Sequence, residues 1–336
     1  MLNQLTANSS GKFLMIHSLV FRDHKFAAEN PAVDTLASLL AEPGVMIWVN
    51  LDAASEEEIR AAMQDAFGVH PLTIEDCVLD NPLPKLEEME NYLYLVMHAV
   101  DYTRADKFTT TELDLILGRN FLITFHRRPL KPLVAAMERF RKNTATLVRG
   151  PDRFAHTLLD LIVENYKPAL DELRQDVETI EEAVLARGQG NLTQDIIETR
   201  DSLSTLRQTI RPQREIVAQL ALGKTPFFRP KLLPYLRDLS DDLVRIEEQA
   251  KGWSEQLIFA FRIHLNRASH EANTGIRVLT GLTAVTIPLL LIGSWFAMNF
   301  HEMPLLSSKT AYWVTLAITI VSTVVMFVFL KRRKWF

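Results

Sequence analysis

The chain has 336 residues, of which 48% are hydrophobic, 37 are Lys or Arg and 41 are Asp or Glu. Residues 278–336 carry five basic residues and one acidic residue, so residues 1–277 are net acidic. An acidic body repels a phosphate backbone, which argues against a nucleic-acid partner. Cys77 is the single cysteine, which excludes an intrachain disulfide scaffold and fits a reducing compartment.

Residues 1–150 are predicted to form a mixed α/β domain. Runs rich in β-branched, aromatic and large apolar residues predict strands at 13–21, 45–51, 92–100, 110–117 and 121–126. Ser55 and Glu58 form a capping-box pattern, which predicts a helix that begins there and continues to Phe67. Two further helices are predicted, at 71–80 and 130–142.

Residues 151–277 are predicted to form a helical stalk. Glycine and proline residues divide it into three long helical runs, at 152–187, 191–222 and about 231 onward. In the third run small and apolar residues recur every three or four positions, which is typical of a helix packed along a seam. Because no helix breaker follows these residues until Pro288, we expect this helix to continue to about residue 297.

Residues 278–336 are predicted to form a transmembrane hairpin with a basic tail. Residues 278–300 and 310–330 carry no formal charge, and a helix of 23 residues spans roughly 34 Å, enough to cross a bilayer. Basic residues flank the hairpin on both sides, and the first 30 residues show no secretory signal. The charge bias therefore predicts a multi-pass protein of the cytoplasmic membrane with both termini in the cytoplasm.

Residues 295–304 (WFAMNFHEMP) lie across the end of the first predicted span. They resemble the Gly-Met-Asn signature that follows the first span in the CorA family of two-span magnesium transporters. The ending at 331–336 (KRRKWF) resembles its basic tail, and 206–215 resembles its second stalk helix. The stretches Thr73-Ile74-Glu75-Asp76 and Pro84-Lys85-Leu86-Glu87-Glu88 resemble its cytoplasmic domain.

The resemblance implies an α+β membrane protein that assembles as a funnel-shaped homopentamer, in contact with membrane lipid. It would conduct divalent cations, with Mg²⁺ as the main cargo and Co²⁺ or Ni²⁺ as others, and it would need no organic cofactor. The first span would line a central pore. The family's pore face, placed on this chain, gives Asn273, Ile276, Leu279, Thr283, Ile287, Leu290 and Ser294.

The signature implies a pore entrance made of Ala297, Met298, Asn299 and Glu302. Mg²⁺ gives up its water reluctantly, so a ring of Asn299 amide oxygens would bind the ion while it is still hydrated. Glu302 would raise the local concentration of cations. Ala297 stands where the family has glycine, and its methyl group would narrow the mouth or shift the turn that aims Asn299.

The resemblance also implies gating by cytoplasmic Mg²⁺ bound between subunits. Asp238 matches one of the family's ligand positions, and Asp101 or Asp106 would take the place of its partner. The adjacent basic residues of the tail would cluster at the cytoplasmic pore mouth or bind lipid phosphates. They are Lys331, Arg332, Arg333 and Lys334.

Other classes of function compete with this interpretation. The sequence contains no Gly-x-Gly-x-x-Gly, Walker or Gly-x-Ser-x-Gly motif, so an enzyme is not expected. A zinc transporter of the same superfamily is the main alternative, although Met298 and Met303 favour Mg²⁺. A pentameric membrane scaffold that does not conduct is the other alternative, because Ala297 departs from the signature.

Overall fold

The computed structural model describes residues 16–79, 81, 83–100, 108–142, 150–186, 192–298 and 310–333. The strands are β1 Ile16–Arg22, β2 Lys25–Glu29, β3 Val45–Asp52, β4 Lys85–Glu88, β5 Tyr92–Val100, β6 Thr110–Gly118 and β7 Phe121–His126. The helices are α1 Val33–Leu40, α2 Glu56–Arg60, α3 Pro71–Val78, α4 Lys131–Lys142, α6 Pro151–Leu185, α7 Leu192–Ala221, α8 Leu233–Phe296 and α9 Ala311–Arg332. The fold class predicted from the sequence is confirmed: a soluble α/β part, long helices and two C-terminal apolar helices.

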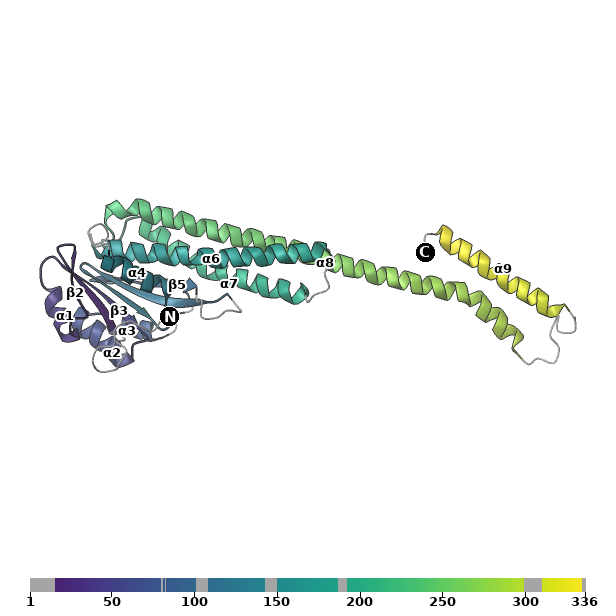
Figure 1. Cartoon of the computed structure of the whole chain (residues 1–336), viewed down its shortest axis with the longest axis horizontal. Coiled ribbons are helices and arrows are strands. Elements are labelled where there is room, and N and C mark those ends of the chain that lie inside the picture. Colours follow the sequence, from purple (N-terminus) through teal and green to yellow (C-terminus); the bar gives the residue numbers. More distant parts are fainter. Residues whose placement is uncertain are drawn as a thin grey trace. The chain divides into compact units, whose positions relative to one another are not determined.

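The chain divides into two compact units, Met1–Ile258 and Phe259–Phe336. The first unit holds the sheet, helices α1 to α7 and the N-terminal part of α8. The second unit holds the rest of α8 and α9 (Figure 1).

The seven strands form one sheet in the order β2-β1-β3-β7-β6-β5-β4. Neighbouring strands are antiparallel except β3 and β7, which are parallel and pair Ile47 with Phe121 and Leu51 with Phe125. The order leaves β2 and β4 at the two edges of the sheet.

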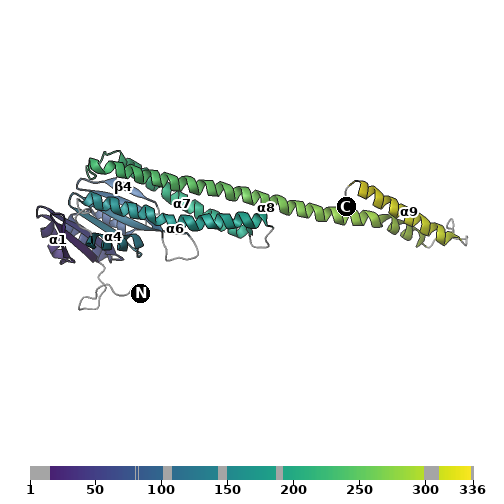
Figure 2. The ribbon, with the colours of Figure 1, turned by 45° about the horizontal axis from the view of Figure 1, so that its top comes forward.

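Helices cover both faces of the sheet (Figure 2). Side chains alternate along a strand, so Ile47, Val49 and Leu51 of β3 point to one face and join a core that includes α1, α2 and α3. Trp48 points to the opposite face, where α4 and α6 pack. The result is a three-layer arrangement whose core lies on both sides of the strands.

An aromatic cluster joins α6 and α4 to the sheet. Phe154 of α6 stacks on Phe140 of α4 with ring centroids 3.9 Å apart, and it meets Trp48 and Phe21 edge-on at 6.0 and 5.2 Å. All four side chains are fully buried. Buried aromatic pairs stabilise a fold beyond their apolar area, so this cluster fixes the start of α6 on the sheet.

Buried polar groups join α7, α6 and β5. Gln213 of α7 donates to the hydroxyl of Tyr166 on α6 at 3.0 Å, and Tyr166 donates to the main-chain oxygen of His98 on β5 at 2.8 Å. The backbone N–H of Val100 donates to Asn165 at 2.9 Å. These groups satisfy one another away from water, which fixes the register of the two helices on the strand.

The structure contains three elements that the sequence did not predict: β2, α1 and β4. The side chains of β2 are all exposed, and β4 has only four residues, so neither shows the apolar pattern used to find strands. The capping box at Ser55 is confirmed, but the helix from α2 continues as a π-helical turn over Ala61–Ala66.

The packed seam predicted on the third helical run is confirmed. Seven of its eight residues are buried and Trp253 is partly buried. The buried members are Leu236, Leu239, Leu243, Ile246, Ala250, Leu257 and Ala260. The helix is continuous to Phe296, close to the predicted end.

A buried carboxylate holds the start of α6 to the segment before α8. Asp152 is 3% exposed and accepts from the Nε and main-chain N of Arg229, at 2.6 and 3.2 Å. The same carboxylate raises the pKa of the Arg229 guanidinium. The ion pair therefore connects residues that are far apart in the sequence.

We expect Asp152→Ala to destabilise the first unit by about 1 to 3 kcal/mol, because it leaves several donors of Arg229 without their acceptor. Thermal unfolding of the purified protein should show a lower midpoint for this variant. Asp171→Ala is the matched control, since Asp171 lies on the same helix in an exposed 3.8 Å pair with Arg174. Equal midpoints for the two variants would contradict the structural role of Asp152.

Candidate functional site

The helices of the second unit expose many apolar side chains that the single chain leaves uncovered. Two helices are long and apolar enough to cross a membrane by length and composition, over Pro230–Phe296 and Tyr312–Arg332. Leu279 and Leu290 are each 65% exposed. Apolar surface of this extent requires lipid or further protein to cover it.

The positions expected to line the pathway form one side of α8. At 100° per residue they fall within an arc of about 120°. All seven are exposed in the single chain. They are Asn273, Ile276, Leu279, Thr283, Ile287, Leu290 and Ser294. Their role in conduction stays a prediction.

The opposite side of α8 is the less exposed one. Pro288, Ile292 and Phe296 are partly buried and recur at helical spacing. Ile292 and Phe296 line an apolar groove of about 300 Å³ together with Thr315 and Ile318 of α9. Within this unit, α8 therefore turns one side to α9 and leaves the expected pathway side free.

The hydroxyl groups on the expected pathway side bond to their own helix. Thr283 donates to the main-chain oxygen of Leu279 at 2.9 Å, and Ser294 donates to that of Leu291 at 3.1 Å. Because each donor is used, the hydroxyl oxygen offers its remaining lone pair outward as an acceptor. An acceptor of this kind suits the water molecules around a hydrated cation.

The end of α8 retains helical hydrogen bonds past its last residue. The N–H of Ala297 donates to the oxygen of Gly293 at 3.1 Å, and the N–H of Met298 donates to that of Trp295 at 3.4 Å. Ala297 has no positive φ, so an alanine fits this backbone without strain. Asn299 and Glu302, expected at the entrance, lie outside the described residues.

Asp238, the expected regulatory ligand, is exposed near the start of α8. It forms no ion pair within the described ranges, whereas Asp242 pairs with Arg245 at 2.5 Å and Glu247 pairs with Arg214 at 2.6 Å. The described residues contain no group of three or more His, Cys, Asp or Glu side chains placed to hold a metal ion. Asp238 is thus available to bind a cation, but it needs ligands from elsewhere.

Two of those expected ligands, Asp101 and Asp106, lie outside the described residues. The structure instead brings His156 and Asp160 of α6 toward the acidic end of α8. Burial lowers the pKa of His156, although the negative charges of Asp160 and Asp238 act in the opposite direction. Burial raises the pKa of Asp160.

Sequence analysis did not find His156 or Asp160. They lie one turn apart on α6, and about 80 residues separate them from the acids of α8, so no local spacing indicates that they meet. The 5.7 Å edge contact between the rings of His156 and Tyr235 comes from the packing of α6 on α8.

The basic tail extends the last turn of α9. Lys331 and Arg332 belong to its final turn and Arg333 is its C-cap, and all three are exposed. Cations at a helix C-terminus interact favourably with the helix dipole. The guanidinium of Arg333 lies 5.6 Å from the ring centroid of Phe329. Lys334 lies outside the described residues.

Comparison with known proteins decides the family. The family model described as "CorA-like Mg2+ transporter protein" matches residues 43–332. The chain belongs to this CorA-like family. The match covers strands β3 to β7 of the sheet, the stalk helices and both apolar helices, so the resemblance seen in the sequence is confirmed.

The chain is similar to several CorA-like proteins. It is 28% identical over 290 residues to the cobalt/magnesium transport protein CorA of Thermotoga maritima, covering 86% of this chain and 83% of the relative. The complete structure of the CorA magnesium transporter from Methanocaldococcus jannaschii matches with a TM-score of 0.82 and 19% identity, over 97% of this chain and 100% of that one. The ZntB cytoplasmic domain from Vibrio parahaemolyticus matches with a TM-score of 0.61 and 12% identity, over 76% of this chain and 98% of that one. The structural matches show the shared fold.

The two sides of α8 predict different access to water. The test uses a Cys77→Ser background. We expect Thr283→Cys and Leu290→Cys to react with a charged, membrane-impermeant thiol reagent, because a thiol that faces water can lose its proton and form the reactive thiolate. Ile292→Cys, on the side toward α9, should be protected. Mass spectrometry of the intact protein measures the extent of modification. Equal reaction at Thr283→Cys and Ile292→Cys would remove the assignment of the two sides.

Proposed function

We propose that this chain forms a divalent-cation channel of the cytoplasmic membrane, with Mg²⁺ as its principal cargo. The observation that carries the proposal is the free side of α8, which alternates hydroxyl and aliphatic side chains and faces away from α9. Membership of a family of transport proteins supports it, as does the relative named as a cobalt/magnesium transport protein.

A channel of this kind requires several copies of the chain. Two apolar helices cannot enclose a water-filled path, whereas a ring of α8 helices can, with α9 on the outside. We propose a homopentamer whose functional parts are the α/β domain 1–150, the stalk 151–277 and the hairpin 278–336. The hairpin would contact lipid through the remaining apolar surface of α9.

The free side of α8 supplies both a path and a closure. Oxygens of Thr283 and Ser294 accept from the water around a hydrated ion. Rings of aliphatic side chains narrow the path and close it when water leaves them. They are Ile276, Leu279, Ile287 and Leu290. The same side of one helix thus carries the conducting and the blocking groups.

Ion selection would take place at the entrance. Neutral amide oxygens of Asn299 hold hydrated Mg²⁺ without the strong binding that a carboxylate ring gives. Glu302 adds negative charge nearby, which raises the local concentration of cations. We propose that both termini are cytoplasmic. A negative-inside membrane potential contributes about 4.6 kcal/mol per 100 mV to inward movement of a divalent ion.

Cytoplasmic Mg²⁺ would close the channel by binding between subunits. Asp238 is exposed and forms no ion pair within the described ranges, which suits a carboxylate that meets an ion at a subunit interface. Asp101 or Asp106 of the neighbouring copy would provide the second ligand. Loss of the bound ion would leave facing carboxylates that repel each other and loosen the interface.

Asn299→Ala should reduce Mg²⁺ uptake into proteoliposomes to the level of empty liposomes, because it removes the amide oxygens that hold the hydrated ion. Assembly should not change, since the substitution lies beyond the end of α8. Size-exclusion chromatography with light scattering checks the assembly. Uptake equal to that of the unmodified protein would remove Asn299 from ion selection.

Asp238→Lys should raise the cytoplasmic Mg²⁺ concentration needed for half-inhibition by about tenfold or more, because a cation replaces a ligand. Asp241→Lys makes the same charge change one turn away, at another exposed acid of α8, and serves as the control. We measure inhibition of flux as Mg²⁺ is added on the cytoplasmic side. An equal shift in both variants would indicate general electrostatics and no ligand role for Asp238.

A further inference from the structure

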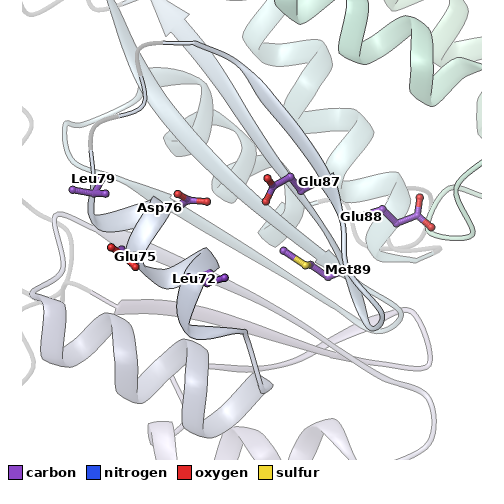
Figure 3. A pocket seen from close by; sticks show the side chains of 7 residues that line it. All are labelled: Leu72, Glu75, Asp76, Leu79, Glu87, Glu88 and Met89. Carbon is purple, nitrogen blue, oxygen red and sulfur yellow. The ribbon is translucent and has the colours of Figure 1, made fainter.

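The part of α8 that belongs to the second unit is basic. Residues 259–296 contain three arginines and one acidic residue. Acidic side chains lie together on the first unit instead, for example Glu75, Asp76, Glu87 and Glu88 between α3 and β4 (Figure 3). The basic part of α8 attracts anions, although the path beside it is proposed to carry cations.

Arg262 lies on the expected pathway side of α8. At 100° per residue it falls about 40° from the middle of the arc of about 120° that holds the seven expected pathway positions. By the same rule Arg277, Glu271 and Arg267 lie about 100°, 140° and 180° from that middle. Over residues 259–296, all of which the structure describes, Arg262 is thus the single charged residue on this side.

Arg262 has no counterion on its own helix. Its side chain is exposed and forms no ion pair within the described ranges. Ile258 and Leu265, one turn before and one turn after it on the same side, are 41% and 50% exposed. Residues 258–266 contain no acidic side chain. A guanidinium keeps its charge at any physiological pH, so this positive charge is permanent.

In the proposed ring of copies, the Arg262 side chains would face one another across the path. This step rests on the proposed channel. Like charges at short range repel, and aliphatic side chains on both sides of the charged ring keep water away and strengthen the repulsion. A divalent cation on the path would meet the same repulsion. A bound anion with several negative charges removes both unfavourable interactions.

The hydrogen-bond donors on this side of α8 suit a phosphate group. A guanidinium presents several N–H groups in one plane and binds phosphate oxygens in pairs. Asn266, one turn after Arg262, and Ser269 add an exposed amide and an exposed hydroxyl. Phosphate oxygens accept hydrogen bonds, so these donors match them.

We propose that the Arg262 side chains of the assembled ring bind a single multivalent phosphate anion, such as a triphosphate. The bound anion lowers the barrier to divalent cations at this level of the path, so conduction depends on both ions. Several copies donate to the same anion, and one anion therefore serves a whole ring.

The binding test uses the full chain in zwitterionic lipid nanodiscs and isothermal titration with inorganic triphosphate, in Mg²⁺-free buffer at about 0.15 M ionic strength. We expect a single triphosphate per assembled ring, with the assembly measured by light scattering. Arg262→Gln should weaken binding at least about tenfold, because it removes the charge and the paired donors. Arg267→Gln makes the same change on the opposite side of α8 and should leave binding unchanged.

Three results would overturn the phosphate site. They are one triphosphate per chain, equal binding by Arg262→Gln and the unmodified protein, and equal weakening by Arg267→Gln. Adenosine triphosphate carries the same phosphate group and should compete with inorganic triphosphate, whereas adenosine should not. Competition by adenosine would show recognition of the nucleoside and would also contradict the proposal.

Mg²⁺ flux into proteoliposomes tests the effect of the bound anion. With free Mg²⁺ buffered to equal values, triphosphate on the cytoplasmic side should raise flux through the unmodified protein about tenfold, because it neutralises the ring. Arg262→Gln should show the higher flux without triphosphate and no response to it. A response of equal size in both proteins would contradict a role for Arg262. If no cation moves while Arg262-dependent binding persists, the proposed channel fails and the phosphate site stands.

Discussion

The uncovered apolar surface of α8 and α9 is the constraint on which the rest of the structure depends. A single chain leaves leucine side chains such as Leu279 and Leu290 largely exposed, and exposing this apolar area to water is unfavourable. Lipid can cover the outer part of such a surface, and the hydroxyl groups of Thr283 and Ser294 donate to their own helix, which leaves only a free acceptor lone pair on each. The mixture of both kinds of side chain on one helix fits the proposed ring of copies around an aqueous path.

The two sides of α8 have different surroundings within the second unit. The side with Ile292 and Phe296 packs toward α9, which leaves the opposite side uncovered in the single chain and able to line the proposed path. The seam from Leu236 to Leu257 uses the same helix to close the core of the first unit. One continuous helix thus belongs to both units, and the acids near its start lie on the element that reaches the expected path.

Much of this could be predicted from the sequence, because the strongest signals are long and local. The uncharged run at 278–300 and the spacing of the seam in α8 each predict a helix from local sequence alone. The edge strand β4 escaped prediction because it has only four residues and none of them is fully buried. The helix α1 escaped because eight residues are a short run for a periodic pattern, although Leu36 is buried. His156 meets the acidic end of α8 only through the packing of two helices, which spacing along one chain does not encode. The fold shared with the ZntB cytoplasmic domain does not identify the ion, and we propose that the entrance near Asn299 makes that choice.

The most direct test is flux of Mg²⁺, Co²⁺, Ni²⁺ and Zn²⁺ into liposomes that contain the purified protein, with an imposed membrane potential and with or without a proton gradient. We predict Mg²⁺ entry that follows the potential, is independent of the proton gradient and stops when Mg²⁺ is present on the cytoplasmic side. Zn²⁺ movement coupled to protons would contradict the choice of ion. No flux of any ion from assembled protein would contradict the channel itself and favour a membrane scaffold.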